Sequence, residues 1–493
     1  MCFAEIAPLT SVNKGYCQNA DLRLLLLAKH FPIQELGLPL TTLSGLLPYW
    51  SIPWFLDKHR SYLMEKFIIQ GRYPLQGEVT PAGNKNAALP LLAACLLTDE
   101  PITLHNVPEI KDVFTMRSLL TSLGVDIQII GNHSIRVQAK QVRPADLDPD
   151  LCKNIRASIL LAGPLIARTG ELHLPPPGGD VIGRRRVDTH FLALQAMQTQ
   201  VSYDRVNHLF NAYTPQLKGA DILLDEASVT ATENAIMAAV LARGDTTVRN
   251  AASEPHIQEL CHFLNQLGGQ VENIGSNTLY IHGVSRLHGG EFTIGPDYLE
   301  VVSFIGAAVL TRGRLRIRNA GSHYLDMTRM IFEKLGAAWV VEGDDILVPE
   351  DQEMVIKADL GDAIPTITVM PWPGFPPDLM SIAIVLATQS KGSVLFHDWM
   401  YNSRMYFTDK LVGMGAQIVL CDPHRCIVNG PTQLYGEKME SPDIRAGIAM
   451  VLAALAAEGQ STIRNVGQID RGYEKIDEKL TLLGAKIERA KES

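Results

Sequence analysis

The sequence lacks an excess of positive charge, a dense set of cysteines and the short motifs of common nucleotide and metal sites. Its formal net charge is −9 over 493 residues, so there is no global basic field for nucleic acid, and any anion site must be a local cluster of arginine and lysine. The seven cysteines are scattered and odd in number, which argues against a secreted disulfide framework and favours a reducing, cytoplasmic compartment. Neither GxGxxG, GxxxxGK(S/T), HExxH nor a paired CxxC occurs, so no dinucleotide site, P-loop, metal or other cofactor is implied.

Residues 1–64 differ from the rest of the chain because a stretch of 21 residues, 36–56, carries no charged side chain. The length would suit a membrane helix, but Pro39, Pro48 and Pro53 interrupt it, and no basic segment precedes an apolar one as in a signal peptide. We therefore expect no membrane association and interpret residues 1–64 as a disordered or dispensable N-terminal extension. Because Met64 also begins a natural-looking protein start, the segment before it is alternatively a translated leader.

From Phe67 onward the chain repeats one pattern six times: an apolar, alanine-rich helix, a strand, a connection, a second helix that ends in a Leu-Gly-like pair, and another strand. The first helices are expected at residues 89–97, 159–167, 235–242, 304–311, 380–388 and 447–457. The pairs are Leu123-Gly124, Met197-Gln198, Leu267-Gly268, Leu335-Gly336, Met414-Gly415 and Leu483-Gly484, spaced by 74, 70, 68, 79 and 69 residues. Glycine in this position suits a left-handed helix C-cap, a pattern from which Gln198 departs. Six units predict an α/β protein of two three-unit domains with a boundary near Gly295 and a site in the cleft between them.

The loop from Leu174 to His190 combines an acid with a run of cations. Three prolines followed by two glycines, Gly178 and Gly179, predict an irregular, restrained connection. Asp180 lies at its tip, and Arg184 to Arg186 follow. An acid held beside cations is typical of proton transfer next to a bound anion, and the alternative is an exposed turn with solvated charges.

Further charged residues stand at the starts of predicted helices. Lys85 and Asn86 precede the first helix, where backbone amides favour an anion; the alternative is an N-cap with a solvated lysine. Asp378 follows Pro376-Pro377 and is either a helix cap or a general base. Arginines recur at the unit junctions, at Arg156, Arg185, Arg404, Arg445 and Arg471. Arg445 is the most informative, because a cation at a helix N-terminus opposes the helix dipole unless an anion binds there.

Cys421 and Cys426 enclose Asp-Pro-His-Arg and resemble half of a metal site. No second pair completes such a site, and a hairpin turn is expected at this point of the sequence. We therefore predict a structural role for both cysteines.

Together these residues resemble the UDP-N-acetylglucosamine 1-carboxyvinyltransferase family, from about Glu65 to Glu492. The stretches that carry the resemblance include Leu75-Gln-Gly-Glu-Val, Gly83-Asn-Lys-Asn-Ala-Ala-Leu-Pro90, Arg156-Ala-Ser-Ile, Phe375-Pro-Pro-Asp378, Asn402-Ser-Arg404, Asp443-Ile-Arg445 and Asp470-Arg-Gly-Tyr-Glu474. The related 5-enolpyruvylshikimate-3-phosphate synthases share the fold but have a different lysine motif. The resemblance implies two inside-out α/β domains of three repeats each, residues 85–296 and residues 65–84 plus 297–493, with the active site between them.

The resemblance also implies the reaction, in which enolpyruvate passes from phosphoenolpyruvate to the 3′-hydroxyl of UDP-N-acetylglucosamine by addition and elimination, releasing phosphate. This is the first committed step of peptidoglycan synthesis, and therefore serves cell shape and division. Asp378 would take the hydroxyl proton. Guanidinium groups suit the phosphate and carboxylate of phosphoenolpyruvate, and the implied cations are Lys85, Arg156, Arg185, Arg404, Arg445 and Arg471. The implied sugar-nucleotide contacts are Asn86, Asp188, Thr189, Ser228, Val229 and Met400. We expect these small-molecule substrates, no nucleic acid, and a monomer or weak dimer.

Asp180 occupies the position where many family members have a cysteine that protonates phosphoenolpyruvate or assists product release. A carboxylic acid can do either if its pKa is raised, whereas neighbouring arginines would lower that pKa. Because the thiolate that fosfomycin alkylates is absent, we predict fosfomycin resistance. Differences from the family pattern at Arg186, Glu226 and Thr230 keep two alternatives open: a paralogue that uses another nucleotide sugar, and a non-catalytic nucleotide-sugar-binding paralogue.

Overall fold

A computed structural model describes residues 65–144, 147–179 and 186–491. The predictions for residues 1–64, Asp180 and Arg185 lie outside these ranges. All described residues belong to one compact unit, Met64–Ser493. Within the described ranges, no helix is both long and apolar enough to cross a membrane.

The first hydrophobic core of this unit is formed by residues between Ala87 and Ile294. Its helices are α3 (Lys85–Ala94), α4 (Lys111–Ser122), α5 (Pro149–Asn154), α6 (Ala162–Thr169), α7 (Asp188–Ala196), α8 (Val229–Ala239) and α9 (Pro255–Gln266). Its three sheets have the orders β13-β3-β5-β4, β6-β8-β7 and β11-β12-β10-β9. The strands are β3 (Ile102–His105), β4 (Asp126–Gly131), β5 (Ser134–Gln138), β6 (Glu171–Leu174), β7 (Gln200–Asp204), β8 (Leu209–Tyr213), β9 (Asp221–Leu223), β10 (Asp245–Arg249), β11 (Gln270–Glu272), β12 (Thr278–His282) and β13 (Gly290–Thr293).

The second core combines residues Phe67 to Val79 with residues Tyr298 to Ala485. Its helices are α10 (Tyr298–Thr311), α11 (Asp326–Lys334), α12 (Met380–Gln389), α13 (Thr408–Gly413), α14 (Ile444–Ala456) and α15 (Ile476–Leu482). Its sheets have the orders β15-β16-β14-β2, β17-β18-β20-β19 and β21-β22-β1-β23. The strands are β1 (Glu65–Gln70), β2 (Gln76–Val79), β14 (Arg314–Ile317), β15 (Val340–Glu342), β16 (Asp345–Val348), β17 (Thr366–Thr368), β18 (Gly392–His397), β19 (Gln417–Asp422), β20 (Arg425–Gly430), β21 (Lys438–Glu440), β22 (Gln460–Arg464) and β23 (Lys486–Lys491).

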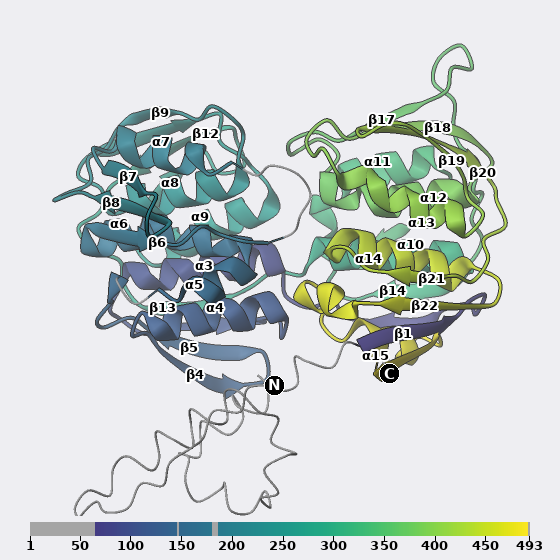
Figure 1. The fold of residues 1–493 in the computed structure, drawn as a ribbon, viewed down its shortest axis with the longest axis horizontal. Helices are drawn as coiled ribbons and strands as arrows, with labels where there is room; N and C mark the ends of the chain where they lie inside the picture. Colours follow the sequence, from purple (N-terminus) through teal and green to yellow (C-terminus); the bar gives the residue numbers. More distant parts are fainter. Residues whose placement is uncertain (1–64, 145–146, 180–185, 492–493) are drawn as a thin grey trace, which may run out of the picture. The chain divides into compact units, whose positions relative to one another are not determined.

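The first helix of each second-core unit is buried on every side. In α10, 13 of the 14 residues are buried, and in α14, 12 of the 13 are buried. A helix that is apolar all round must lie inside a shell of other elements. Figure 1 shows this arrangement, with α10, α12 and α14 between the sheet that contains β18 and the sheet that contains β22. The sequence-predicted alanine-rich helices are therefore the inner elements of the fold.

The second residue after each second helix is left-handed in all six units. The five glycines, Gly124, Gly268, Gly336, Gly415 and Gly484, have φ between 84° and 105°. Gln198 adopts φ 69°, so the unit that departs from the glycine pattern keeps the same backbone turn with a side chain in it. The Leu-Gly-like pair that recurs in the sequence therefore marks a left-handed backbone turn that every unit contains.

Two chain segments cross side by side between the cores. Asn84 N–H donates to Gly295 O at 2.8 Å, and Asp297 N–H donates to Ala82 O at 2.8 Å. The carboxylate of Asp297 then caps α10 and also accepts from Lys85 N–H at 3.3 Å. Lys85 is thereby fixed at the crossing, where α3 begins.

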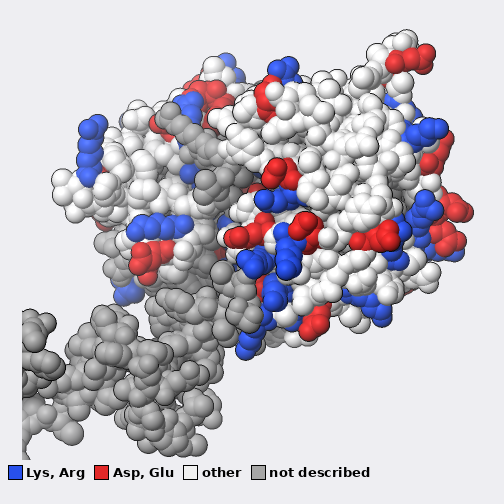
Figure 2. Space-filling view, turned by 45° about the vertical axis from the view of Figure 1, so that its right-hand side comes forward, with Lys and Arg blue, Asp and Glu red and all other residues white. Residues whose placement is uncertain are grey.

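Cys421 and Cys426 flank a β-hairpin. Strand β19 pairs antiparallel with β20 through this turn, as predicted. Cys421 is exposed and Cys426 is buried. On the face shown in Figure 2, the described basic and acidic side chains lie intermixed.

Candidate active site

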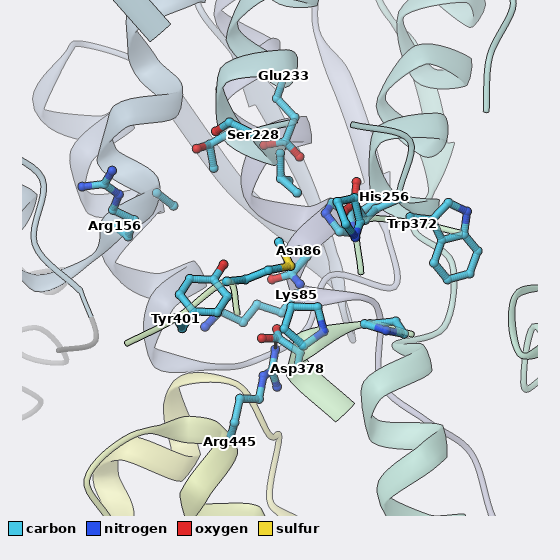
Figure 3. Close-up of a pocket in the computed structure, with 18 of the residues that line it drawn as sticks. Lys85, Asn86, Arg156, Ser228, Glu233, His256, Trp372, Asp378, Tyr401 and Arg445 are labelled. Atoms are coloured by element: carbon cyan, nitrogen blue, oxygen red, sulfur yellow. Dashed lines mark ion pairs between the residues drawn. The ribbon is translucent and has the colours of Figure 1, made fainter. Parts of the chain in front are cut away.

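A cavity of about 450 Å³ is lined by residues of both cores, a size typical of a small-molecule site. Figure 3 shows Asp378 and Arg445 pointing toward each other, with Lys85 and Tyr401 beside them and Glu233 and Ser228 farther along the cavity. The predicted site residues that line it are Lys85, Asn86, Arg156, Ser228, Val229, Asp378, Met400, Arg404, Arg445 and Arg471. Residues far apart in the sequence therefore meet in one place.

Asp378 lies between two arginines. It sits in the short 3₁₀ helix Pro377–Leu379, directly before α12. Arg404 Nη2 donates to its Oδ1 and Arg445 Nη2 reaches its Oδ2, each at 3.0 Å. Both carboxylate oxygens are therefore engaged by guanidinium groups, and α12 receives no side-chain cap, so the helix-cap alternative for Asp378 is wrong.

The protonation of Asp378 is controlled by opposing effects. Burial alone would raise the pKa of its carboxyl group, but the charges of Arg445 and Arg404 outweigh burial and hold the pKa well below its usual range. Burial would lower the pKa of Arg445, but Asp378, together with Tyr473, Asp297 and Tyr298, outweighs burial and raises it. The intramolecular anion that meets Arg445 at the start of α14 is thus Asp378, which accounts for a cation in that position.

A second buried carboxylate, Asp112 at the start of α4, bridges two further cations. Lys85 Nζ lies 2.7 Å from Asp112 Oδ2, and Arg471 Nε donates to Asp112 Oδ1 at 2.9 Å. Burial would raise the pKa of Asp112, but Lys85 and Arg471 lower it. Lys85 is only 7% exposed, so the alternative of a solvated lysine is wrong. Sequence reasoning missed Asp112, although the charged pair Lys111-Asp112 at a helix start was visible.

The N-terminus of α8 faces the cavity. Ser228 is its N-cap residue and makes no side-chain capping bond, and Val229 and Thr230 follow along the cavity wall. Free backbone N–H groups at a helix N-terminus favour an anionic group such as a diphosphate. The Thr230 hydroxyl contacts His190 Nε2 at 3.1 Å, so the side chain at this position is held in place.

The remaining predicted contacts lie beside the cavity wall. Thr189 Oγ1 donates to Asp225 Oδ1 at 2.6 Å, and Asp188 pairs with Arg186 at 3.0 Å. Arg186 also pairs with Asp225 at 2.9 Å, and its carbonyl accepts from Arg156 Nη2 at 2.6 Å. Arg186 therefore ties Asp188 and Arg156 together, and neither Asp188 nor Thr189 is among the residues that line the cavity.

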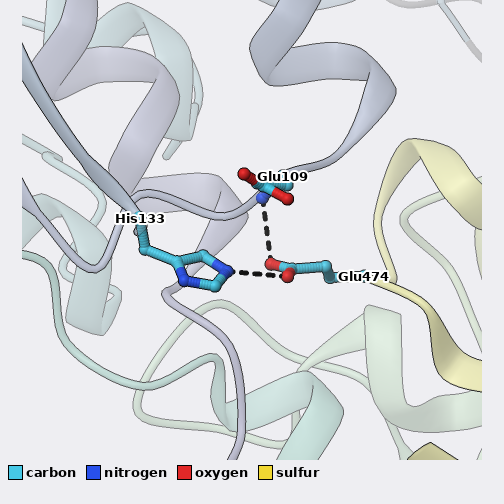
Figure 4. Close-up of side chains that lie close together, drawn as sticks. All are labelled: Glu109, His133 and Glu474. Atoms are coloured by element: carbon cyan, nitrogen blue, oxygen red, sulfur yellow. Dashed lines mark hydrogen bonds and ion pairs between the residues drawn. The ribbon is translucent and has the colours of Figure 1, made fainter. Parts of the chain in front are cut away.

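One group of side chains has the composition of a metal site. The ligand atoms of Glu109, His133 and Glu474 lie within 4.8 Å of one another (Figure 4). Glu474 Oε2 accepts from Glu109 N–H at 2.9 Å, and its Oε1 contacts His133 Nε2 at 2.7 Å. Both carboxylate oxygens of Glu474 already have partners within the protein. We therefore interpret the three side chains as a structural contact that joins the segments around Glu109 and His133 to the segment around Glu474.

Comparison with known proteins places this geometry in a family. Residues 69–480 match the sequence model of EPSP synthase (3-phosphoshikimate 1-carboxyvinyltransferase). The chain is 55% identical over 428 residues to UDP-N-acetylglucosamine 1-carboxyvinyltransferase of Bradyrhizobium diazoefficiens, covering 87% of this chain and 98% of that protein. The enzyme of the same name from Treponema denticola is 54% identical, covering 86% of this chain and 99% of its own length.

Solved structures confirm the predicted fold class of two inside-out α/β domains with three repeats each. The enolpyruvyl transferase NikO from Streptomyces tendae has a TM-score of 0.77 at 24% identity, covering 87% of this chain and all of that one. An EPSP synthase from Acinetobacter baumannii has a TM-score of 0.66 at 18% identity over the same shares. The chain therefore belongs to the enolpyruvyl transferase family described by the EPSP synthase model, among relatives named UDP-N-acetylglucosamine 1-carboxyvinyltransferase.

Proposed function

We propose that this protein transfers the enolpyruvyl group of phosphoenolpyruvate to the 3′-hydroxyl of UDP-N-acetylglucosamine and releases phosphate. The observation that carries the proposal is the meeting of four cations, Lys85, Arg404, Arg445 and Arg471, around two buried carboxylates in one cavity. A donor with a phosphate and a carboxylate needs such cations, and a hydroxyl nucleophile needs a proton acceptor. The relatives at 54–55% identity carry the name of this activity.

The cations also set the strength of the proposed base. Asp378 is a weak proton acceptor while Arg404 and Arg445 hold it, because its pKa is lowered. An anionic donor that engages the same arginines would weaken their hold on Asp378 and raise its pKa. In this mechanism Asp378 takes the proton of the attacking hydroxyl only when phosphoenolpyruvate is in place, and the C–O bond forms as the methylene carbon gains a proton. Phosphate then leaves as the new methyl group loses a proton, which restores the double bond of the enolpyruvyl group.

The role of Asp180 remains a prediction from the sequence. Aspartate in place of the family's cysteine supplies an acid for the methylene carbon or for product release, but no thiolate for alkylation. We expect fosfomycin to leave the activity of this protein intact, whereas the Asp180→Cys variant should lose activity irreversibly and gain a covalent adduct by mass spectrometry. Irreversible labelling of the unmodified protein would contradict this prediction.

A different nucleotide sugar is the second candidate acceptor. Glu226 and Thr230 line the cavity at the end where α8 begins, and both differ from the family pattern. A panel of nucleotide sugars in the same assay separates the two acceptors. The proposal also includes a cytoplasmic location and a role in peptidoglycan synthesis, which complementation of a strain that lacks the activity would test.

The direct test is phosphate release from phosphoenolpyruvate by the purified protein, with and without UDP-N-acetylglucosamine. We expect release that depends on the acceptor. Binding of the nucleotide sugar without any turnover would instead support the non-catalytic paralogue. Repeating the assay with a chain that starts at Met64 shows whether residues 1–63 affect the reaction.

A further inference from the structure

Arg404 and Asp398 each carry one buried polar atom that has no hydrogen-bond partner among the described residues. These atoms are Arg404 Nε, a donor, and Asp398 Oδ2, an acceptor. Arg404 lines the cavity, whereas Asp398 is 0% exposed, follows directly after β18 and does not line the cavity. Because a buried polar atom without a hydrogen bond is costly, an unpaired donor and an unpaired acceptor on neighbouring side chains point to a second arrangement that pairs them.

The two side chains are close enough for each to influence the charge of the other. Burial raises the pKa of Asp398, and the positive charge of Arg404 opposes this effect. Burial would lower the pKa of Arg404, but nearby acidic groups outweigh burial and raise it; in decreasing order they are Asp378, Tyr401, Asp443 and Asp398. Arg404 therefore has Asp398 within electrostatic reach, in addition to Asp378, which it already binds.

Asp398 is fixed in place by its backbone and by its other carboxylate oxygen. Its Oδ1 accepts from Met400 N–H at 3.0 Å and from Tyr401 N–H at 3.2 Å, which shapes the loop that leads to Arg404. Its own N–H donates to His424 O at 2.8 Å, and His424 Nδ1 contacts its carbonyl oxygen at 2.7 Å. The guanidinium carbon of Arg404 lies 4.7 Å from the centre of the Tyr401 ring. Only Oδ2 of Asp398 is left to accept a further hydrogen bond.

We propose that Asp398 is a positioning residue for Arg404, whose Nη groups leave Asp378 for the bound donor while its Nε gains a hydrogen bond to Asp398 Oδ2. The inference rests on the proposed function and states how the donor releases the proposed base. In the structure, Arg404 Nη2 binds Asp378 Oδ1 at 3.0 Å, and Nε is idle. The hydrogen bond gained at Asp398 offsets the one lost at Asp378, so the buried guanidinium keeps an anionic partner from the protein throughout. Asp378 is then held by Arg445 alone and becomes a stronger base.

The test replaces one oxygen of Asp398 and keeps the other. Asp398→Asn retains an oxygen for the N–H groups of Met400 and Tyr401, but its NH₂ group cannot accept from Arg404 Nε. We expect the Kd for phosphoenolpyruvate, measured by calorimetry, to rise about tenfold, and kcat to fall about tenfold because Arg404 stays on Asp378. The KM for UDP-N-acetylglucosamine and the Tm should stay unchanged. Asp398→Ala removes both oxygens and should also raise that KM and lower the Tm, because Met400 lines the cavity.

A double-mutant cycle separates positioning of Arg404 from a purely structural role. In an Arg404→Met background, which has no Nε, Asp398→Asn should leave the Kd for phosphoenolpyruvate unchanged. Asp422→Asn is the matched control: Asp422 Oδ1 accepts from His424 N–H at 2.8 Å in the adjacent hairpin, and Asp422 does not line the cavity. This control should change neither the Kd for phosphoenolpyruvate nor kcat.

An Asp398→Asn variant that binds phosphoenolpyruvate as tightly as the unmodified protein would overturn the inference. An equal rise in Kd with and without the Arg404 side chain would overturn it too. If the unmodified protein turns over no nucleotide sugar, the proposed function fails, and the Kd values of the cycle still decide the role of Asp398. Absence of any phosphoenolpyruvate binding by the unmodified protein would overturn both.

Discussion

Buried carboxyl groups on the two walls of the cavity are stabilised in opposite protonation states. On one wall, which we call the charged wall, Asp378 and Asp112 stay ionised because each lies between two cations. On the other, the neutral wall of Glu233, Glu254 and His256, the two acids have no cation partner in the described part of the chain, and burial raises their pKa values. The charged wall suits an anionic donor and a proton transfer, and the neutral wall suits an uncharged part of a substrate. The neighbours of a carboxyl group therefore decide whether it is charged and which part of a substrate it suits.

The largest expected effect comes from breaking the charged wall at Asp378. Asp378→Asn removes the proton acceptor and leaves Arg404 and Arg445 without their shared carboxylate. We expect kcat for phosphate release to fall by about 10³-fold, within the range for loss of a general base, while phosphoenolpyruvate still binds. Stopped-assay kinetics and calorimetry with phosphoenolpyruvate measure the two quantities. A variant that retains more than a tenth of the activity would exclude Asp378 as the base.

The next effect concerns Asp112, which holds Lys85 and Arg471 together. Asp112→Asn should raise KM for phosphoenolpyruvate by about tenfold or more, because two like charges lose the anion between them. It should also lower the free energy of unfolding by about 3 kcal/mol, since one partner of a buried ion pair is removed. Urea titrations and steady-state kinetics measure both effects.

Asp345→Asn is the matched control for both carboxylates. Asp345 also pairs with two arginines, Arg316 at 3.1 Å and Arg318 at 3.4 Å, but does not line the cavity. It should lose stability without any change in KM or kcat. An Asp112→Asn variant whose KM matches that of the control would show that Asp112 is structural only.

The smallest effect is a difference in pH dependence between the two walls. The pKa of Glu254 is raised from 4.5 to about 7 in the folded protein, so its contribution to stability is present below pH 4.5 and is lost as pH rises toward 7. The pKa of Asp378 is lowered, so its contribution is present above its unfolded value of 3.8 and is lost as pH falls through that value toward the lower folded value. Glu254→Gln should therefore flatten the fall in the free energy of unfolding between pH 4.5 and 7 by about 3 kcal/mol. Urea titrations across this range measure it, and an unchanged slope would place Glu254 outside the neutral wall.

The sequence predicted the repeats and the cations, because both leave local signals. Alanine-rich helices and glycine after each second helix report burial and a left-handed turn, and Arg445 stood out as a cation at a helix start. Proline and charge near Asp378 indicated a held carboxylate, but the choice between cap and base needed the positions of Arg404 and Arg445. That choice depends on the contacts of Asp378 with two residues that lie 26 and 67 positions farther along the chain.

The neutral wall left no signal in the sequence. Glu233 lies in an ordinary helix, and Glu254 and His256 surround a proline at a helix start, where acids are common. Asp112 was missed for a related reason, since an acid in the first turn of a helix is usually solvated. Only the fold shows that these side chains are buried and which of them meet a cation.

The central claim is that the charged wall transfers an enolpyruvyl group to the hydroxyl of a nucleotide sugar. The most direct measurement is the initial rate of phosphate release from phosphoenolpyruvate with UDP-N-acetylglucosamine, with the organic product identified by mass spectrometry. The account predicts acceptor-dependent release and a nucleotide sugar in which one hydrogen is replaced by an enolpyruvyl group. Phosphate release without the acceptor, or a folded protein that forms no such product with any nucleotide sugar, would contradict it.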